Sequence, residues 1–269
     1  MTKNGQGVVT DVNRREKLTE ALDVLSGMTG ETSSERITEI ARAALAVSED
    51  CVEAWLVLAQ QAADSPEAMR AHLESAVEAG DRLFAERKER LRGKFGALPE
   101  AQSYMQARFI LGQALWDGGL HAQALEVLHT TLELHEADPQ GVRYVLLKAM
   151  LDDKLYVDAD NLLAQYPAEQ STVILYGRLL TNFVLHGDGL LARSAFLAAR
   201  KYNPFVLDYL LGLRNVPQKI PTHGQPGDDA EAVRYALVFG ETWDKVPGAL
   251  DFVRTQKRIR LEKDVRKKR

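Results

Sequence analysis

The sequence is poor in several features that would assign it to a class at once. It has a single cysteine, Cys51, among 269 residues, so an intramolecular disulfide is excluded. No window approaches the roughly 18 consecutive apolar residues of a membrane span, and the N-terminus lacks the apolar core of a secretory signal peptide. These absences favour a cytoplasmic protein in which Cys51 is a small, buried helix residue.

Motifs for catalysis and cofactor binding are also missing. The six histidines include no pair at i, i+3 or i, i+4, so no helix offers two imidazoles to one metal ion. There is no G-x-S-x-G motif, and Gly93-Lys94 has Lys88 where a P-loop needs its first glycine. The acidic segment 152–161 lacks the central glycine of a calcium loop. The sequence therefore predicts no catalytic residue, no metal site and no cofactor.

Charge is distributed unevenly along the chain. Residues 254–269 contain nine Lys or Arg and two acidic residues, a net charge of +7. Because the whole chain carries −4, residues 1–253 carry −11. An acidic body with a basic tail is not typical of a general nucleic-acid binder. The tail is either a solvated helical extension or a contact for nucleic acid or an anionic surface, and it has no aromatic residue to stack on bases.

Helical spacing runs through most of the chain, and strand patterns are nearly absent. Three dipeptides, Ser65-Pro66, Asp138-Pro139 and Asn203-Pro204, each place a side-chain acceptor at a helix cap and proline at the first helical position. Helices are expected at about 14–26, 34–48, 51–63, 66–92 (broken near Gly80), 100–117, 121–136, 139–152, 155–165, 169–186, 189–202 and 205–213. The predicted fold class is therefore all-α.

A repeat underlies these helices. Ala124, Ala159 and Ala192 are 35 and 33 residues apart, close to the 34-residue period of the tetratricopeptide pattern. The alanines must be small because the two antiparallel helices of a pair approach closely there. The repeat positions in register with them are Leu111, Gly112, Ala124, Leu146, Ala159, Tyr176, Leu179, Ala192, Phe196 and Pro204. The sequence predicts a tetratricopeptide-like α-solenoid of antiparallel helix pairs.

Some segments depart from the repeat. Thr131 stands where a small residue is expected, and the copy that starts at residue 140 has Lys154 in place of the turn glycine. The insertion 81–100 does not fit the period, and a longer helix or an elbow is expected there. Before residue 100 the register weakens, so the number of repeats in that part is left open.

The predicted organisation has five parts. They are a flexible N-terminus (1–13), degenerate N-terminal helix pairs (14–98), tetratricopeptide-like repeats (99–214), a proline-rich loop with capping helices (215–253) and the basic tail (254–269). The prolines of residues 215–226 prevent a helix from following directly, and Asp228 with Glu231 forms a capping box that starts a new one. A solenoid exposes an apolar end that needs a cover, so residues 215–253 are predicted to be that cap; an active-site lid is the alternative.

Several segments resemble a known family. They are QSYMQARFILGQALWDGGLHAQALEVL from residue 102, DPQGVRYVLL from 138, ADNLLAQYP from 159, YNPFVLDYLLG from 202 and GDDAEAVRYALVFGETWDKVPGALDFV from 227. Over roughly residues 98–253 the chain resembles the tetratricopeptide-type module of bacterial proteins similar to the suppressor of tumorigenicity seven family. The resemblance implies a helical-repeat module without an established enzymatic activity or cofactor. The chain departs from the family in having Ser103 at a place associated with proline, and it lacks the cysteine-rich zinc-binding extension of some multidomain relatives.

In a tetratricopeptide array the first helix of each pair lines a concave groove. By the period, the groove residues are Gln106, Phe109, Gln113, Tyr144, Lys148, Arg178 and Thr181. A groove with aromatic residues and two cations suits an extended or helical peptide. The alternative is that several of these residues pack against an adjacent helix. If Lys148 and Arg178 do line an open groove, replacing both by Glu should leave the melting temperature unchanged.

These observations predict a non-enzymatic scaffold that binds an unidentified protein or peptide. Two alternatives stay open. One is a nucleic-acid or ribosome-associated adaptor that uses residues 254–269, and the other is an enzyme with a pocket near Arg178, Tyr209 and Trp243.

Overall fold

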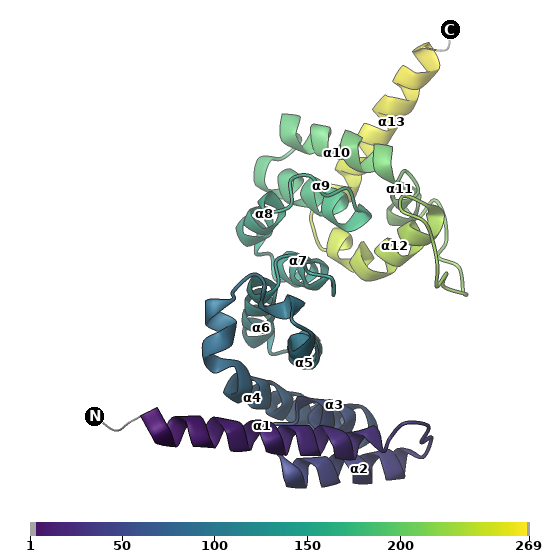
Figure 1. Ribbon diagram of the computed structural model, residues 1–269. Helices are drawn as coiled ribbons and strands as arrows, with labels where there is room; N and C mark the ends of the chain where they lie inside the picture. Colours follow the sequence, from purple (N-terminus) through teal and green to yellow (C-terminus); the bar gives the residue numbers. More distant parts are fainter. Residues whose placement is uncertain (1–3, 268–269) are drawn as a thin grey trace. The chain divides into compact units, whose positions relative to one another are not determined.

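The computed structural model describes the backbone of residues 4–267 and the side chains of residues 13–260 and Glu262. In that part of the chain every regular element is a helix and none is a strand, so the predicted all-α class is confirmed. The chain divides into two compact units, unit 1 (residues 1–143) and unit 2 (residues 144–269). The helices of each unit follow one another in chain order (Figure 1).

Unit 1 is built from helices that pack in sequence order. Its elements are α1 (Asn4–Ser26), α2 (Ser34–Val47), α3 (Val52–Gln61), α4 (Pro66–Arg90), the 3-10 turns η1 (Phe95–Ala97) and η2 (Pro99–Ala101), α5 (Gln102–Asp117) and α6 (His121–Leu134). Each helix contacts the next, and α3 also contacts α5. The start of α1 lies ahead of the expected start near residue 14 and within the stretch predicted to be flexible; the side chains of residues 1–12 lie outside the described part.

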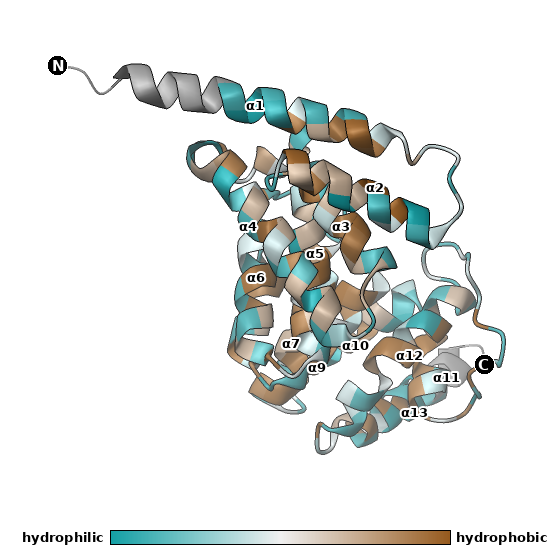
Figure 2. Cartoon of the chain, turned by 90° about the horizontal axis from the view of Figure 1, so that it is seen from below, coloured by the Kyte–Doolittle hydropathy of each residue, from teal (hydrophilic) through white to brown (hydrophobic). Residues whose placement is uncertain are grey.

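Two apolar clusters hold unit 1 together. The first joins α1, α2 and α3 and is rich in alanine, with Ala21, Ala41, Ala44, Ala54 and Leu58 among its buried members. The second joins α3, α4, α5 and α6 and includes Phe95, Tyr104 and Leu111. Brown apolar segments on the helices of this unit alternate with hydrophilic ones (Figure 2). Small side chains let the first three helices approach closely, whereas large ones fill the wider space of the second cluster.

Helix α4 corrects the expected break near Gly80, because it runs without interruption from Pro66 to Arg90. A Cβ atom at position 80 would lie 2.0 Å from Cδ2 of Tyr104. Glycine here therefore provides space for the aromatic ring on α5, although it costs about 1 kcal/mol in helix propensity relative to alanine. The insertion 81–100 consists of the second half of this long helix followed by η1 and η2, which agrees with the expected longer helix or elbow.

The pair α5 and α6 explains one departure from the repeat. A Cβ atom at Gly112 would lie 2.6 Å from Cδ2 of Leu128, so the two helices approach closely there. Thr131 on α6 occupies a position predicted to hold a small apolar residue. Its Oγ1 accepts a hydrogen bond of 3.0 Å from Nε of the buried Arg108 on α5. A buried guanidinium needs such acceptors, and threonine supplies one at little extra volume.

Unit 2 contains the end of α7 (Val142–Asp152) from residue 144 onward, followed by shorter helices. They are α8 (Tyr156–Ala164), α9 (Thr172–His186), α10 (Leu190–Tyr202), α11 (Val206–Leu210), α12 (Asp229–Asp244) and α13 (Ala249–Lys267). Contacts join α8 to α9, α9 to α10 and α11 to α12; α12 also packs on α9, and α13 packs on α9, α10 and α12. Sequential packing is thus present here too, with the last two helices folded back on the α9–α10 pair.

Most predicted repeat positions are buried. The three alanines that define the register, Ala124, Ala159 and Ala192, have no exposed surface. Large members of the pattern are equally enclosed, namely Leu111, Leu146, Tyr176, Leu179 and Phe196. Pro204 is the exception, because it is exposed in the turn between α10 and α11. Burial at these spacings shows that the pattern marks the packed faces of the helices.

The predicted helix starts are correct at one of the three proline sites. Ser65 caps α4 by accepting a hydrogen bond of 3.1 Å from the backbone N–H of Ala68, and Pro66 is the first helical residue. Asp138 also acts as a cap, but from a turn: its carboxylate accepts a 2.7 Å bond from the N–H of Val142, where α7 begins. Pro139 therefore lies outside the helix, contrary to prediction.

The third site, Asn203-Pro204, has a different role from a simple cap, because α11 begins only at Val206. The buried Asn203 carboxamide donates to Thr172 Oγ1 (3.2 Å) and to the carbonyl of Asp228 (3.0 Å). The hydroxyl of Tyr176 donates to the backbone carbonyl of Asn203 at 2.6 Å. Asn203 thus connects α9, the end of α10 and the start of α12.

The predicted capping box of α12 is present with one difference. Asp228 Oδ1 accepts a 2.8 Å bond from the N–H of Glu231, as expected. Glu231 Oε2 accepts a 2.5 Å bond from the N–H of Gly227, one residue before the cap, instead of from the N–H of Asp228. Glu231 Oε1 accepts a 3.3 Å bond from the N–H of Thr172. The box therefore also ties the start of α12 to the start of α9.

Candidate functional site

The predicted groove residues of unit 1 lie on α5. Gln106 is exposed, and Phe109 and Gln113 are half-buried. They are accessible to a partner, although the described contacts gather no polar network around them.

The predicted groove residues of unit 2 have partners inside the protein. The hydroxyl of Tyr144 donates to Glu169 Oε1 at 2.5 Å. Lys148 pairs with Asp152, and Arg178 donates to the carbonyls of Leu163 (3.1 Å) and Tyr166 beyond the end of α8. Thr181 is fully buried and therefore does not line a groove. Both cations thus have partners inside the protein, although Lys148 and Arg178 remain partly exposed.

Helix α12 packs on α9 and also contacts Lys148 and Asp152 near the end of α7. Lys148 Nζ lies 6.0 Å from the ring centre of Phe239, and Thr242 Oγ1 donates to Asp152 Oδ1 at 2.6 Å. The rings of Tyr235 and Tyr176 lie 5.3 Å apart. Among the predicted groove residues of unit 2, Lys148 thus lies beside α12, a helix of the predicted cap, whereas Tyr144 and Arg178 have their partners elsewhere.

The anchors of α12 make it a permanent part of unit 2. Tyr235, Phe239 and Trp243 are each at most 3% exposed, and Trp243 Nε1 donates to the Tyr235 hydroxyl at 2.9 Å. Removing one buried aromatic side chain costs about 3–5 kcal/mol, a large part of the roughly 5–15 kcal/mol that stabilises a domain. Displacement of the whole helix by a partner is therefore unfavourable.

The sequence left open an enzyme with a pocket near Arg178, Tyr209 and Trp243. In the structure Arg178 binds carbonyls and Trp243 lies in the core. The hydroxyl of Tyr209 donates to the carboxylate of Asp229 at 3.1 Å, and the same carboxylate pairs with Arg214 at 2.5 Å. Each of the three side chains thus has a structural partner of its own.

Unit 1 contains a cleft that the sequence did not identify. It lies between α1 and the second half of α4, has a volume of about 700 Å³, and also reaches α3, η2 and α5. We call it the α1–α4 cleft. Its apolar side chains come mainly from α1, α3 and α4, namely Leu18, Leu22, Val52, Leu83 and Phe84. Its cations are Arg15, Arg82, Arg87 and Arg90.

A shared carboxylate holds the two walls of the α1–α4 cleft together. Asp50, in the turn between α2 and α3, binds Arg14 of α1 at 3.0 Å and Arg82 of α4 at 2.7 Å. The side chain of Asp50 is only 12% exposed, so these pairs are stronger than surface pairs. Arg87 binds Glu100 at 2.7 Å and joins α4 to η2. The insertion 81–100 is thereby fixed as one wall.

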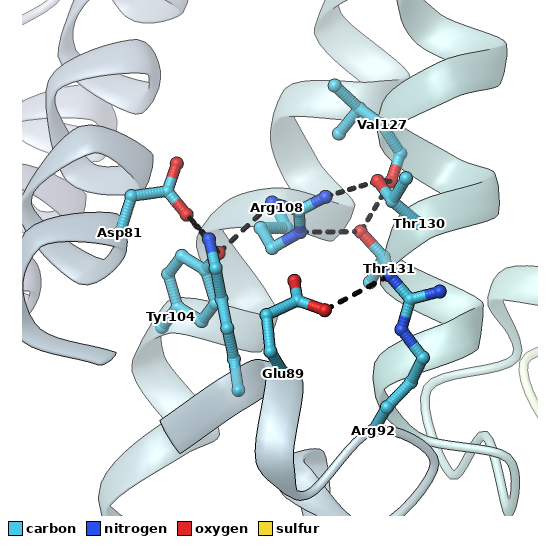
Figure 3. A network of polar contacts seen from close by, with 9 residues as sticks. Asp81, Glu89, Arg92, Tyr104, Arg108, Val127, Thr130 and Thr131 are labelled. Atoms are coloured by element: carbon cyan, nitrogen blue, oxygen red, sulfur yellow. Dashed lines mark hydrogen bonds and ion pairs between the residues drawn. The ribbon is translucent and has the colours of Figure 1, made fainter. Parts of the chain in front are cut away.

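Tyr104 lies at the boundary between the α1–α4 cleft and a buried polar network (Figure 3). Its hydroxyl donates to Asp81 Oδ1 at 2.6 Å and accepts a 3.1 Å bond from Arg108 Nη1. Arg108 reaches Thr131 and Thr130 on α6. Figure 3 shows Arg108 between Tyr104 on one side and the two threonines on the other. The network links α4, α5 and α6 behind the cleft.

Two pKa values in this network are shifted. Burial raises the pKa of Tyr104 above its ordinary value. Burial, the largest single influence, would lower the pKa of Lys88, but its hydrogen bonds and charge interactions with Asp81 and Tyr104 together outweigh burial, and the pKa is raised. Tyr104 therefore stays neutral and Lys88 stays charged at neutral pH, which suits a structural network better than proton transfer near pH 7.

Other chemistry in the described residues is limited. Burial raises the pKa of the Cys51 thiol to about 11, so it is a poor nucleophile at neutral pH. The described side chains contain no cluster of three or more His, Cys, Asp or Glu suited to a metal ion. Within the described helices, none combines the length and apolar character needed to cross a bilayer. Most side chains of the basic tail 254–269 beyond Arg260 lie outside the described residues, although α13 extends to Lys267.

Sequence reasoning did not show that the predicted groove residues of unit 2 have partners inside the unit, and it did not identify the α1–α4 cleft of unit 1. The signal that marked the cleft was the insertion 81–100, which supplies Arg82, Leu83, Phe84, Arg87 and Arg90 to its wall. A segment that interrupts a regular repeat is free of the repeat's packing role, and it can therefore build a site.

Comparison with known proteins finds distant relatives and no matching family model. The chain is 24% identical over 259 residues to the "Protein ST7 homolog" of Caenorhabditis elegans, which covers 83% of this chain and 48% of that protein. The corresponding protein of Caenorhabditis briggsae is 23% identical with the same coverage. "Ribosome quality control complex subunit 1" of Schizosaccharomyces pombe is 26% identical over 153 residues, 52% of this chain and 22% of that protein. The chain thus spans about half the length of the ST7 homologs that it matches.

Proposed function

We propose that this protein is a non-enzymatic binding scaffold with a tetratricopeptide-like fold and that it acts in the cytoplasm. In this proposal it holds a protein or peptide partner in the α1–α4 cleft. The observation that carries the proposal is the cleft itself. It is built on paired helices, has a volume of about 700 Å³, and combines an apolar lining with charged groups. Binding sites typically have such a volume, a largely apolar lining and a few polar groups that orient the ligand.

Most of the apolar side chains that line the cleft are partly exposed, which favours a role in binding a partner over a role in the packed core. Leu22 on α1 is 39% exposed, although it lies next to a buried alanine in the same helix. An apolar side chain that lines a cleft and remains accessible loses its contact with water when a partner binds, which contributes about 25 cal/mol per Å² of apolar surface. The contact between α9 and α12 in unit 2 offers no such gain, since Tyr176, Tyr235 and Phe239 are already buried there.

Site-specific photocrosslinking tests this function in the full-length chain. A photoreactive phenylalanine analogue at position 22 is expected to capture a defined protein in cells. The matched control carries the analogue at position 237 on α12, where Leu237 is 46% exposed but lies outside the cleft. Capture at both positions, or at neither, contradicts a partner site at the α1–α4 cleft.

A second candidate is a ribosome-associated adaptor that uses the basic tail. Two observations favour it: the net charge of +7 over residues 254–269, and the similarity over 153 residues to a protein named as a subunit of the ribosome quality control complex. Deletion of 254–269 should then abolish co-sedimentation with ribosomes, and binding by the full chain should fall steeply with salt. Co-sedimentation that survives the deletion excludes this role for the tail.

A further inference from the structure

The α1–α4 cleft gathers positive charge in an acidic unit. Residues 1–143 contain 15 Lys or Arg and 23 Asp or Glu, a net charge of −8. Residues 82–94, which form one wall of the cleft and the adjoining turn, contain six basic and two acidic residues, a net charge of +4. The side chains that line the cleft itself include four arginines and three glutamates, a net charge of +1, so the positive excess lies mainly on the α4 wall and its adjoining turn. This local excess bears on what the cleft binds.

The arginines of the cleft differ in whether they already form an ion pair within the protein. Arg82 is paired with Asp50, and Arg87 with Glu100. The guanidinium groups of Arg15 on α1 and Arg90 at the end of α4 have no partner among the side chains that the structure describes. Both are exposed. Two guanidinium groups on opposite walls are thus available to carboxylates of a ligand.

The apolar lining lies between these walls. Leu18 and Leu22 come from α1, and Leu83 and Phe84 from α4. Phe84 also packs edge-on to Phe95 at 5.3 Å, so its ring is held in place. A rigid apolar wall of this kind provides the anchor position that one or two large side chains of a helical or extended peptide require.

We propose that the α1–α4 cleft recognises an amphipathic segment of a partner protein that carries large apolar side chains flanked by carboxylates. The apolar side chains enter between Leu22 and Phe84, and the carboxylates bind Arg15 and Arg90. This inference rests on the proposed scaffold function and specifies the chemistry of its partner.

A nucleic acid fits the cleft less well. Glu53, Glu86 and Glu100 also line it, and they would repel a continuous phosphate backbone. The lining has only two aromatic side chains, Phe84 and Tyr104, and both are engaged in other contacts, whereas base stacking needs accessible aromatic faces. A peptide with separate carboxylates can avoid the glutamates, while a polyanion cannot.

Fluorescence anisotropy with two designed peptides tests the inference on the full-length chain. Both are fluorescein-labelled amphipathic helices of about 14 residues with leucine at i, i+3, i+4 and i+7; one has glutamate at its polar positions and the other has lysine. We expect the glutamate peptide to bind at least about tenfold more tightly than the lysine peptide. We also expect the double variant Arg15→Glu with Arg90→Glu to reverse this preference. Leu22→Ser should weaken binding of the glutamate peptide by about tenfold.

A second double variant controls for the effect of the protein's overall charge on binding. Arg36→Glu with Arg42→Glu alters two exposed arginines on α2 by the same total charge and should leave the preference intact. Equal binding of both peptides, or an equal effect of the two double variants, overturns the inference. If the glutamate peptide does not bind but the photoreactive group at position 22 still captures a protein, the charge preference is wrong and the scaffold function stands. If both fail, the scaffold function fails as well.

Discussion

In unit 2 the predicted groove residues are engaged inside the unit, with Lys148 beside α12 and Arg178 bound to carbonyls of α8 and the turn after it. Unit 1, in contrast, has a cleft next to α4, the long helix that interrupts the predicted repeat. In both units the helices pack in chain order, and small buried residues lie between them. They differ in the segments that adjoin the repeat: unit 2 continues into an aromatic helix that packs on α9, and unit 1 contains a long helix whose second half forms one wall of the cleft. Paired helices thus provide a frame, and the irregular segments decide whether a face is filled or left accessible.

The largest expected effect distinguishes the filled face from the accessible one. Trp243→Ala should lower the free energy of unfolding by roughly 3–5 kcal/mol, because it opens a cavity and removes the hydrogen-bond donor to Tyr235. Leu22→Ala in the cleft should change it by less than about 1 kcal/mol, since the side chain is partly exposed and lacks a fully packed surrounding. Chemical denaturation of both variants measures the difference. Equal losses would mean that α12 is not a structural part of unit 2.

A charge reversal sharpens the same comparison. Lys148→Glu with Arg178→Glu should destabilise the protein by about 1.5–3 kcal/mol, because it places a carboxylate beside Asp152 and removes the donors to two carbonyls. This reverses the expectation from the sequence that the melting temperature would be unchanged.

The unit 1 counterpart of that reversal, Arg15→Glu with Arg90→Glu, should change stability by no more than about 0.5 kcal/mol. Thermal melts of the two double variants provide the measurement. If the unit 2 variant melts like the parent protein, Lys148 and Arg178 are free after all, and the groove prediction is restored.

Two helical glycines should respond in opposite directions. Gly80→Ala in unit 1 places a Cβ against the ring of Tyr104, and the overlap, typically about 1–3 kcal/mol, should exceed the gain in helix propensity of about 1 kcal/mol. Gly240→Ala on α12 meets no atom within 4 Å and should stabilise by about 0.5–1 kcal/mol. Urea denaturation that gives the same sign for both would show that α4 and α5 do not approach closely at Gly80.

The last comparison concerns alkaline pH, because its effect is absent at neutral pH. Burial raises the pKa of Cys51 in unit 1 from 9.0 to about 11, and it raises the pKa values of Tyr176 and Tyr235 in unit 2 above 10. In each case the unfolded chain releases its proton at a lower pH than the folded one. Stability is therefore complete below pH 9 and falls as the pH rises further.

The contribution of Cys51 can be separated from that of the tyrosines. Cys51→Ala should reduce the loss of stability between pH 9 and 11 and leave the loss above pH 11 in place. Denaturation series at fixed pH values test this. An unchanged profile would show that the thiol does not take part in the alkaline loss.

The comparison also shows how far the sequence could be interpreted. The period of the alanines identified the buried faces of α6, α8 and α10, because close packing of paired helices admits only small side chains there. The same reasoning failed at Gly80, where glycine suggested a helix break. Glycine is required there by Tyr104, a residue 24 positions later that reaches α4 only in the folded protein.

The candidate site was less accessible to such reasoning. Lys148 and Arg178 lie on the predicted helices, but their partners are decided by long-range contacts. No local pattern shows that Phe239 will lie over Lys148, since more than 90 residues separate them in the sequence. The insertion 81–100 was recognisable as irregular, yet its role as a wall depends on Asp50 holding α1 against α4.

Local patterns in the sequence were enough to predict the all-α class of the described residues, the packing of the helices in chain order, and the small residues that lie between them. These properties follow from local periodicity and from the volume available between neighbouring helices. The packing of α12 on α9 and beside Lys148 of α7, and the cleft between α1 and α4, become visible only in the folded molecule. Those outcomes depend on contacts between residues far apart in the chain, and the energies of such contacts are set by the positions of both partners in space.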